Sequence, residues 1–81
     1  MEIFPKTPYL IIIMGHIYTI QEQEKNRFFV THEICRNEVS SFVETRIFVL
    51  SDKKIWRVEG ESEINEMHML EIFQAIESGI E

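Results

Sequence analysis

The fold of this chain is decided by the stretch Tyr9-Leu10-Ile11-Ile12-Ile13-Met14-Gly15-His16-Ile17-Tyr18-Thr19-Ile20. Nine of its twelve residues are aliphatic, methionine or aromatic, and five of these are isoleucine. Because isoleucine loses rotamer freedom in a helix and packs well on a pleated surface, the composition favours one long strand over residues 9–20, with a bulge or bend at Gly15. Both alternating faces of such a strand are apolar, which predicts cover on both sides.

The length and composition indicate one folded domain over residues 1–81. Hydrophobic residues make up 44% of the chain and charged residues 27%, as in globular proteins, although so short a chain has a marginal core. The single Cys35 cannot form an internal disulfide, which fits a reducing compartment. No secretion signal is recognised, and the apolar run is too short and too polar to span a bilayer. We therefore expect a soluble cytoplasmic protein without membrane contact.

The net charge of −6 is concentrated in the last third of the chain. Residues 58–81 hold seven of the fourteen acidic residues and no lysine or arginine, whereas residues 1–57 are nearly neutral. Direct binding to nucleic-acid phosphates requires a cationic surface and is therefore not expected. The natural complement of this segment is a basic surface on another protein.

The hydrophobic pattern predicts an α+β fold: a four-stranded antiparallel meander with strand order 1-2-3-4 and one C-terminal α-helix packed on one face. An N-terminal arm, residues 1–8, contains both prolines. The meander spans residues 9–59, with strands over residues 9–20, 27–35, 39–50 and 55–59. The acidic C-terminal segment spans residues 62–79, with Ser62 as N-cap, a helix over residues 63–78 and Gly79 as the C′ residue.

Three cross-strand pairs set which side chains share a face: Ile20 with Phe28, Arg36 with Val39, and Leu50 with Ile55. In this register the apolar stripe of the helix covers a face that includes Phe28, Val30, Ile47 and Val49. The stripe itself consists of Met69, Ile72, Phe73 and Ile76. The opposite face then carries eight large apolar side chains: Ile11, Ile13, Ile17, Phe29, Phe42, Phe48, Leu50 and Ile55.

So many apolar side chains exceed what a soluble monomer usually exposes on one face. Three arrangements can cover them: a sheet that curls around itself, a second copy of the chain, or another protein. We favour a homodimer, and its expected contact residues are Ile11, Ile13, Ile17, Phe29, Phe42 and Phe48.

The histidines are the main candidates for chemistry, because the expected register places His16 opposite His32 on one face. Two imidazoles on neighbouring strands can bind a transition metal, but no third ligand follows at a diagnostic spacing. Cys35 lacks a partner that would activate it as a nucleophile, and the glycines belong to no phosphate-binding motif. The interpretation is two histidines at the boundary between sheet and helix, with no metal, no cofactor and no catalytic site, so the protein is not expected to be an enzyme.

The acidic helix carries the strongest functional signal. Most surface helices mix both charge signs, since opposite charges four residues apart stabilise them and like charges destabilise them. Here no cation offsets Glu63, Glu66 and Glu77, and Met67 and Leu70 lie among them. A solvated helix face would also explain this pattern. The functional hypothesis is an acidic interaction module in which these five residues bind a basic protein surface.

Two more specific hypotheses remain open. Compact size and one-sided charge suit an inhibitor made by a phage or mobile element, which would block a nucleic-acid-handling enzyme of a restriction or CRISPR system at its cationic channel. The alternative is a small-molecule-binding or weakly enzymatic dimer, with a pocket between a curved sheet and the helix near His16, His32 and Tyr18.

One segment resembles a known family. Ile47-Phe48-Val49-Leu50-Ser51-Asp52-Lys53-Lys54-Ile55-Trp56-Arg57-Val58-Glu59 is similar to the closing hairpin of SnoaL-like cone folds, in which a turn with Asp and Lys precedes an Ile-aromatic strand. The resemblance covers thirteen residues, and Lys53 stands where that family has a turn glycine. The chain also has no room for the N-terminal helices that line the pocket of that family. We therefore infer no membership from it.

Overall fold

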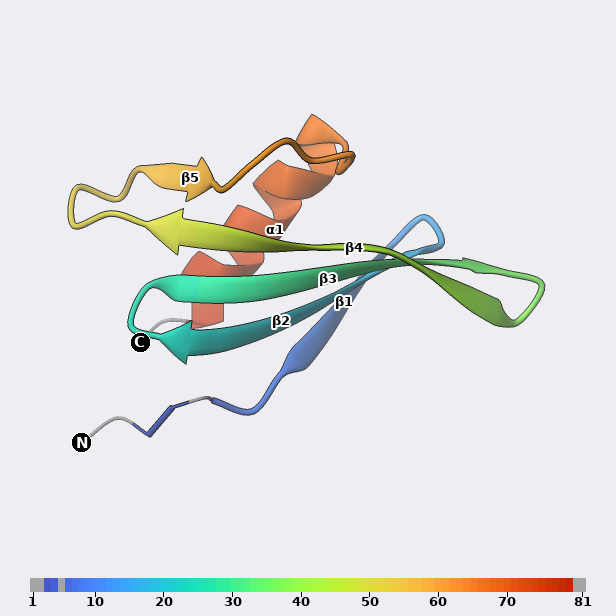
Figure 1. Ribbon diagram of the computed structural model, residues 1–81, viewed down its shortest axis with the longest axis horizontal. Coiled ribbons are helices and arrows are strands. Elements are labelled where there is room, and N and C mark those ends of the chain that lie inside the picture. Colours follow the sequence, from blue (N-terminus) through green and yellow to red (C-terminus); the bar gives the residue numbers. More distant parts are fainter. Residues whose placement is uncertain (1–2, 5, 80–81) are drawn as a thin grey trace.

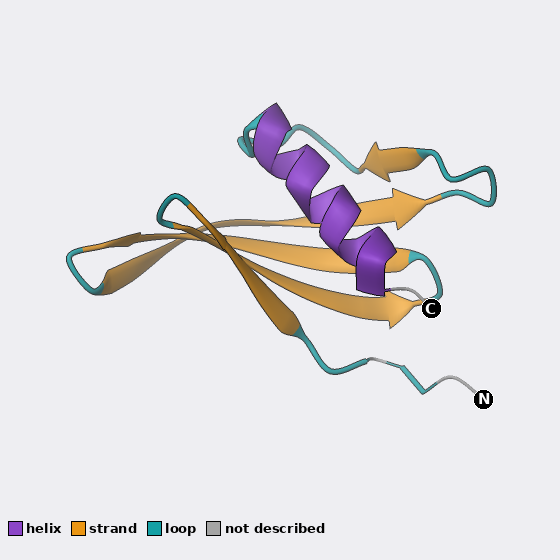
Figure 2. Cartoon of the chain, turned by 180° about the vertical axis from the view of Figure 1, so that it is seen from behind, coloured by secondary structure: helices purple, strands orange, loops and turns teal. Residues whose placement is uncertain are grey.

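The computed structural model describes residues 3–4 and 6–79, which form one antiparallel sheet and one helix. The elements are β1 (Tyr9–Ile13), β2 (His16–Glu24), β3 (Arg27–Arg36), β4 (Val39–Leu50), β5 (Trp56–Val58) and α1 (Glu66–Gly79). The sheet has the sequential order β1-β2-β3-β4-β5, and α1 crosses one of its faces (Figure 1, Figure 2). The predicted α+β class, antiparallel sheet and C-terminal helix are confirmed, but the sheet has five strands where four were predicted.

The fifth strand arises because the predicted long strand over residues 9–20 is a hairpin. Met14 and Gly15 have φ angles of 48° and 83° and form its two-residue turn, between the pair Ile13 and His16. Positive φ at both central positions is the geometry of a type I′ turn, whose twist matches that of the flanking strands. Gly15 is therefore a turn residue and not the expected bulge.

This turn changes which side chains share a face. Ile11 pairs with Tyr18, and Ile13 pairs with His16, so these four side chains point to the same side of the sheet. Tyr18 is fully buried beneath α1, and Ile11 packs against the same core. Ile11 and Ile13 consequently lie on the helix side, and their predicted place on the opposite face is wrong.

The middle of the sheet follows the prediction more closely. The β3–β4 hairpin has the predicted pair Arg36 and Val39, and Asn37 and Glu38 take positive φ angles in its turn. Ile20 pairs with Val30, two residues from the predicted partner Phe28. A shift of two residues preserves the alternation, so Tyr18, Ile20, Phe28 and Val30 share the helix side as predicted.

β4 differs from the prediction by one residue along most of its length. His32 pairs with Glu44 but Glu33 pairs with Phe42, so Val43 is the extra residue of a β-bulge. Beyond the bulge every side chain of β4 changes face, and Leu50 pairs with Trp56 in place of Ile55. Phe48 and Leu50 are therefore buried beneath α1, whereas Ile47 and Val49 face the other way. The predicted outer position of Phe48 and Leu50 is wrong.

The turn between β4 and β5 explains why Ile55 does not pair with Leu50. The Ser51 hydroxyl accepts a hydrogen bond from the Ile55 backbone N–H at 3.1 Å, and the Ser51 N–H donates to the Ile55 carbonyl at 2.9 Å. Lys54 takes a positive φ of 64°. These bonds hold Ile55 in the loop, so β5 begins at Trp56.

The helix begins three residues later than predicted. Asn65 is its N-cap, because the Asn65 side-chain oxygen accepts a hydrogen bond from the Met67 N–H at 2.8 Å. Ser62 instead accepts from the Ile64 N–H in the preceding loop. The predicted stripe is confirmed: Ile72 and Ile76 are buried, and Met69 and Phe73 are partly buried against the core. The expected contact of Ile80 lies outside the described residues.

One hydrophobic core lies between the sheet and α1. Its buried members come from both layers and include Tyr18, Ile20, Phe28, Val30, Phe48, Leu50, Ile64, Ile72 and Ile76. Trp56 stacks on Phe73, with ring centroids 4.7 Å apart, and so joins β5 to the helix. No helix among the described residues is long and apolar enough to cross a membrane.

Candidate functional site

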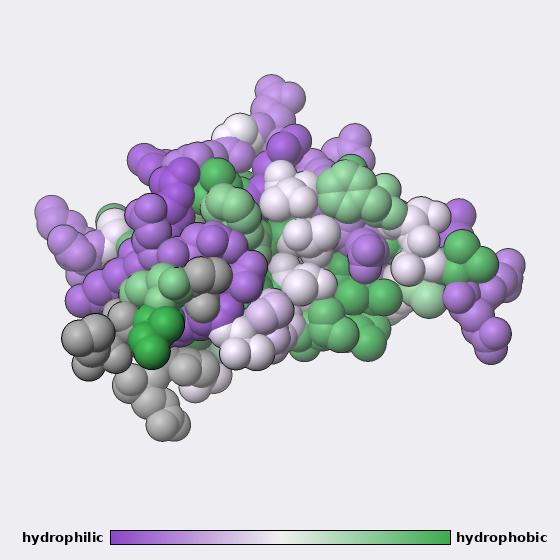
Figure 3. Space-filling model, turned by 60° about the horizontal axis from the view of Figure 1, so that its bottom comes forward, coloured by the Kyte–Doolittle hydropathy of each residue, from purple (hydrophilic) through white to green (hydrophobic). Residues whose placement is uncertain are grey.

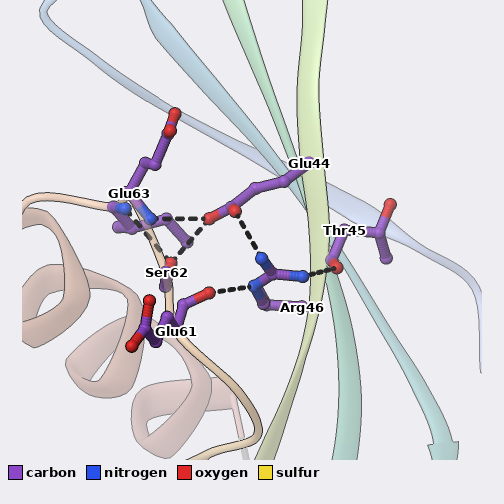
Figure 4. A network of polar contacts seen from close by, with 7 residues as sticks. Glu44, Thr45, Arg46, Glu61, Ser62 and Glu63 are labelled. Atoms are coloured by element: carbon purple, nitrogen blue, oxygen red, sulfur yellow. Dashed lines mark hydrogen bonds and ion pairs between the residues drawn. The ribbon is translucent and has the colours of Figure 1, made fainter.

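The exposed face of α1 is held at a defined place by the loop of residues 59–65 that precedes it. Glu44 on β4 is the anchor of this loop: one of its carboxylate oxygens accepts hydrogen bonds from the Ser62 hydroxyl at 2.6 Å and from the Glu63 N–H at 3.1 Å (Figure 4). The other oxygen forms an ion pair with Arg46 at 3.1 Å. Bonds of this kind, in which one partner is charged, are stronger than neutral ones.

Arg46, the ion-pair partner of Glu44, also bonds to this loop. The Arg46 Nε donates a hydrogen bond of 2.6 Å to the backbone carbonyl of Glu61 (Figure 4). Glu44 points toward the helix side because the bulge at Val43 reverses the alternation of β4 at that point. The bulge at Val43 thus places the anchor of the loop that leads into the helix.

The face of α1 that points away from the sheet combines acidic and apolar side chains. Glu66 and Glu71 of α1 and Glu63 of the preceding loop are exposed, and no lysine or arginine occurs between residues 58 and 81. Met67 and Leu70 lie among them with 73% and 58% of their surface exposed. Side chains three residues apart are neighbours on a helix surface, so these two form one apolar spot. We call Glu63, Glu66, Met67, Leu70 and Glu71 the acidic helix face.

Glu77 has a different environment from the other predicted carboxylates. One of its oxygens accepts a hydrogen bond from the Trp56 indole N–H at 2.9 Å, which ties the end of the helix to β5. Glu77 is exposed, but a substitution there would also disturb helix docking. Glu71 is therefore a cleaner member of the acidic helix face than Glu77.

All three histidines of the chain meet at the boundary between the sheet and the helix. The His16 Nδ1 lies 2.8 Å from the His32 Nε2, and the Tyr18 hydroxyl lies 2.6 Å from the His68 Nδ1. The ring of Tyr18 stacks on that of His32, with centroids 4.7 Å apart. The ring of His16 meets that of His68 edge-on at 5.0 Å. We call His16, Tyr18, His32 and His68 the histidine cluster.

Within this cluster, His32 is 3% exposed and its Nδ1 has no hydrogen-bond partner among the described residues. A neutral imidazole has one donor and one acceptor nitrogen. If the His32 Nε2 carries the proton and donates it to the His16 Nδ1, the His32 Nδ1 has only a lone pair. An unpaired lone pair then takes the place of an unpaired N–H at this buried atom. Protonation would add a buried N–H without an acceptor.

The electrostatics follow from this packing. Burial lowers the pKa of His32, and the nearby His16 and His68 lower it further, while Glu44 and Glu63 oppose the shift. Burial also raises the pKa of Tyr18 to about 12, which keeps its hydroxyl protonated and able to donate to His68. The packing of the cluster therefore favours the neutral form of His32.

A pH dependence of stability follows from this pKa shift. The unfolded chain binds a proton at His32 below about pH 6.5, whereas the folded chain resists it to lower pH. The free energy of unfolding should therefore fall as pH decreases from 6.5 toward the lower, folded pKa, by at most about 1.4 kcal/mol per pH unit for this proton. Chemical denaturation between pH 5 and pH 8 measures the slope. His32→Gln should flatten it, and an equal slope in both proteins would contradict the assignment.

The sequence predicted His16 directly opposite His32, but the register is shifted by two residues, so His16 pairs with Ile34 and His32 pairs with Tyr18. The two imidazoles still share one face, and His68 was treated as a residue at the edge of the helical stripe. The signal for His68 was its spacing: it precedes Ile72 by four residues and Ile76 by eight, which places all three on one side of the helix. What the sequence did not contain was the partner of His68, because Tyr18 lies fifty residues away along the chain.

Within the described part of the chain no three His, Cys, Asp or Glu side chains are placed to hold a metal ion. Cys35 is half-buried on β3, on the side of the sheet opposite to His32. The rings of the histidine cluster pack on one another, and two shallow hollows lie elsewhere, one beside Ile34 and Val39 and one beside Val49 and Ile55.

Comparison with known proteins adds no relative to this picture: no protein-family model, no curated protein and no solved structure matches the chain.

Proposed function

We propose that this protein is a small protein-interaction module whose acidic helix face binds a basic surface on another protein. The observation that carries the proposal is the apolar spot of Met67 and Leu70 within a ring of carboxylates. Exposed apolar side chains that adjoin each other and are rimmed by polar ones are typical of protein-binding sites. Carboxylates around them select a cationic partner and speed its approach.

The charge pattern supports the proposal independently of the apolar spot. Like charges along a helix surface lower its stability by a few tenths of a kcal/mol per pair, roughly what opposite pairs would contribute. The helix retains Glu66 and Glu71, and the loop before it retains Glu63, without a lysine or arginine among residues 58–81. A face that serves only to contact water would gain stability from a single lysine four residues away from one of these carboxylates.

The chemistry of the face also defines the kind of partner. A cationic groove with an aliphatic or aromatic floor would receive both the carboxylates and the apolar spot. Enzymes that handle nucleic acids have such grooves, since they bind phosphates. The proposal therefore includes an inhibitor of such an enzyme, for example in a restriction or CRISPR system, and this narrower form rests on size and charge alone.

A peptide array provides the test. Arrayed peptides that combine Lys or Arg with Leu, Phe or Trp should bind the protein, and peptides of the same composition with Glu in place of Lys or Arg should not. The triple variant Glu63→Lys, Glu66→Lys, Glu71→Lys should lose this binding, by at least about 100-fold at low salt, because the attraction becomes repulsion.

The matched control is a triple reversal elsewhere on the surface. Glu24, Glu38 and Asp52 are exposed and lie in or beside the hairpin turns of the sheet, and their reversal changes net charge by the same amount. Binding that is lost in both triple variants would indicate a net-charge effect and contradict a specific helix face. Retained binding in the helix variant would contradict the proposal outright.

A further inference from the structure

The face of the sheet that points away from α1 is largely apolar and has no cover among the described residues. Its large side chains are Leu10, Ile12, Ile17, Phe29, Phe42, Ile47, Val49 and Ile55, of which Leu10, Ile12, Phe42 and Ile55 are more than half exposed. Figure 3 views this side obliquely and shows hydrophobic and weakly polar side chains across the middle, with hydrophilic ones toward both ends. We call it the outer sheet face.

The accessible surface of the chain is large for its mass. A monomeric protein of 9.7 kDa typically exposes about 5100 Å², whereas this chain exposes 5930 Å². The excess includes surface of the uncovered sheet face and of the β3–β4 hairpin, which extends past the helix (Figure 1). It is about 800 Å², which matches what each partner buries in an interface of standard size.

We propose that the outer sheet face is the interface of a homodimer, in which the sheets of two copies pack face to face. This interaction is separate from the acidic helix face and does not depend on what that face binds. Two sheets that pack in this way lie about 10 Å apart, and their strands stay roughly aligned. A second copy supplies an apolar, sheet-shaped surface of matching size without requiring any other protein.

The small residues at the centre of the face suit such packing. Thr19, Thr31 and Thr45 pair in one row across β2, β3 and β4. The hydroxyls of Thr31 and Thr45 lie 3.3 Å apart and bond to each other. Because buried polar groups need hydrogen-bond partners, this bond allows the methyl groups of Thr31 and Thr45 to enter a dry interface. The larger apolar side chains flank this row on both sides.

The charges at the two ends of the face are complementary to those of a second copy. Arg27 and Arg57 both contact Glu59 at one end, which leaves one positive charge in excess, and Glu33 lies at the other end. Arg27 and Glu33 are six residues apart on β3, so their midpoint is Val30. A two-fold axis across the strands at Val30 brings Glu33 of each copy opposite Arg27 of the other. Closed two-fold symmetry is the commonest arrangement of homo-oligomers.

The dimer places the two helices on opposite outer surfaces. Each α1 covers the face of its sheet that points away from the interface (Figure 2). Both acidic helix faces then remain accessible and point in opposite directions, so one dimer can hold two basic partners. The two acidic helix faces of one dimer would bind two separate partner molecules, because they point away from each other and cannot contact the same one.

Sedimentation velocity of the purified full chain, from micromolar to millimolar concentration, tests the proposal. The wild-type protein should sediment as a dimer. Phe29→Lys, in the middle of the outer sheet face, should raise the dissociation constant at least about 100-fold, because a two-fold interface contains each change twice and buries two unpaired charges. Met67→Lys, an equal exchange on the acidic helix face, should leave the dimer intact.

Each outcome decides the proposal. A wild-type monomer up to millimolar concentration would overturn it and assign the face to another protein. Equal dimerisation of the Phe29→Lys and wild-type proteins would also overturn it, since the copies would then meet elsewhere. Thr31→Lys is a second variant in case Phe29→Lys fails to fold, as judged by far-UV circular dichroism. A folded Thr31→Lys monomer supports the proposal, and a Thr31→Lys dimer as tight as wild type overturns it.

Discussion

Replacing Phe48 with alanine should lower the free energy of unfolding by about 3–5 kcal/mol, as buried phenylalanines generally do. The Phe48 side chain is fully buried and its ring meets those of Trp56 and Phe73. A chain of 81 residues has a total stability of roughly 4–12 kcal/mol. The variant should therefore lose about a quarter or more of the total stability, and at the lower end of this range it would be largely unfolded at room temperature. Urea denaturation followed by tryptophan fluorescence, with Trp56 as the reporter, measures the loss.

The matched control is Phe42→Ala on the same strand. Phe42 lies on the outer sheet face and is 65% exposed in the single chain. At protein concentrations low enough for the proposed dimer to dissociate, its loss should change the stability of the monomer by less than about 0.5 kcal/mol. This comparison also tests the register of β4, because the sequence alone placed Phe42 and Phe48 on one face. If both variants lost equally little stability, Phe48 would lie on the exposed face together with Phe42. This result would contradict the bulge at Val43 and support the register predicted from the sequence.

The sequence-based prediction was reliable where a single periodicity extends over a whole element. The apolar stripe of α1 could be predicted because Met69, Ile72, Phe73 and Ile76 follow the helical period, and nothing interrupts it. The strand β4 has the predicted bounds, Val39–Leu50, although its alternation is interrupted at Val43. In the helix local composition and global packing agree, so no tertiary information was needed to predict its stripe.

The predicted sheet faces were wrong where a turn or a bulge changes the alternation of side chains along a strand. The turn at Met14 and Gly15 has apolar strand residues on both sides, and isoleucine favours a strand equally before and after it. The bulge at Val43 lies in an unbroken strand sequence. Because each such event reverses every later side chain, Ile11, Ile13 and Phe48 were assigned to the wrong face. Only pairing with a neighbouring strand determines where the extra residue goes.

The candidate sites show the same division. The exposure of Met67 and Leu70 on the outer side of the helix follows from helix geometry alone. The anchoring role of Glu44 and the bond between Tyr18 and His68 could not be predicted, because each joins residues from distant parts of the chain. Glu77 was grouped with the partner-binding residues, and its bond to the Trp56 indole became visible only when β5 and α1 were placed side by side.

Replacing Ile72 with alanine is the second change with a large expected effect. Ile72 is fully buried between α1 and the sheet, and loss of a buried isoleucine costs about 2–5 kcal/mol. Leu70 is the matched control, since it lies on the same helix two residues earlier and is 58% exposed. Leu70→Ala should change stability by less than about 0.5 kcal/mol. Urea denaturation of the two variants gives both values, and a larger loss for Leu70→Ala would contradict the orientation of the helix.

The same pair of variants separates docking of the helix from binding by the helix. A 14-residue helix is marginal in water by itself, so α1 keeps its shape because it is docked on the sheet. Ile72→Ala should therefore weaken peptide binding only under conditions that also unfold the protein. Leu70→Ala should weaken binding about tenfold in a fully folded protein, as expected for an apolar anchor of an interface. If Leu70→Ala binds the basic peptides as wild type does, the carboxylates act without an apolar anchor, and the surface is a charged contact of lower specificity.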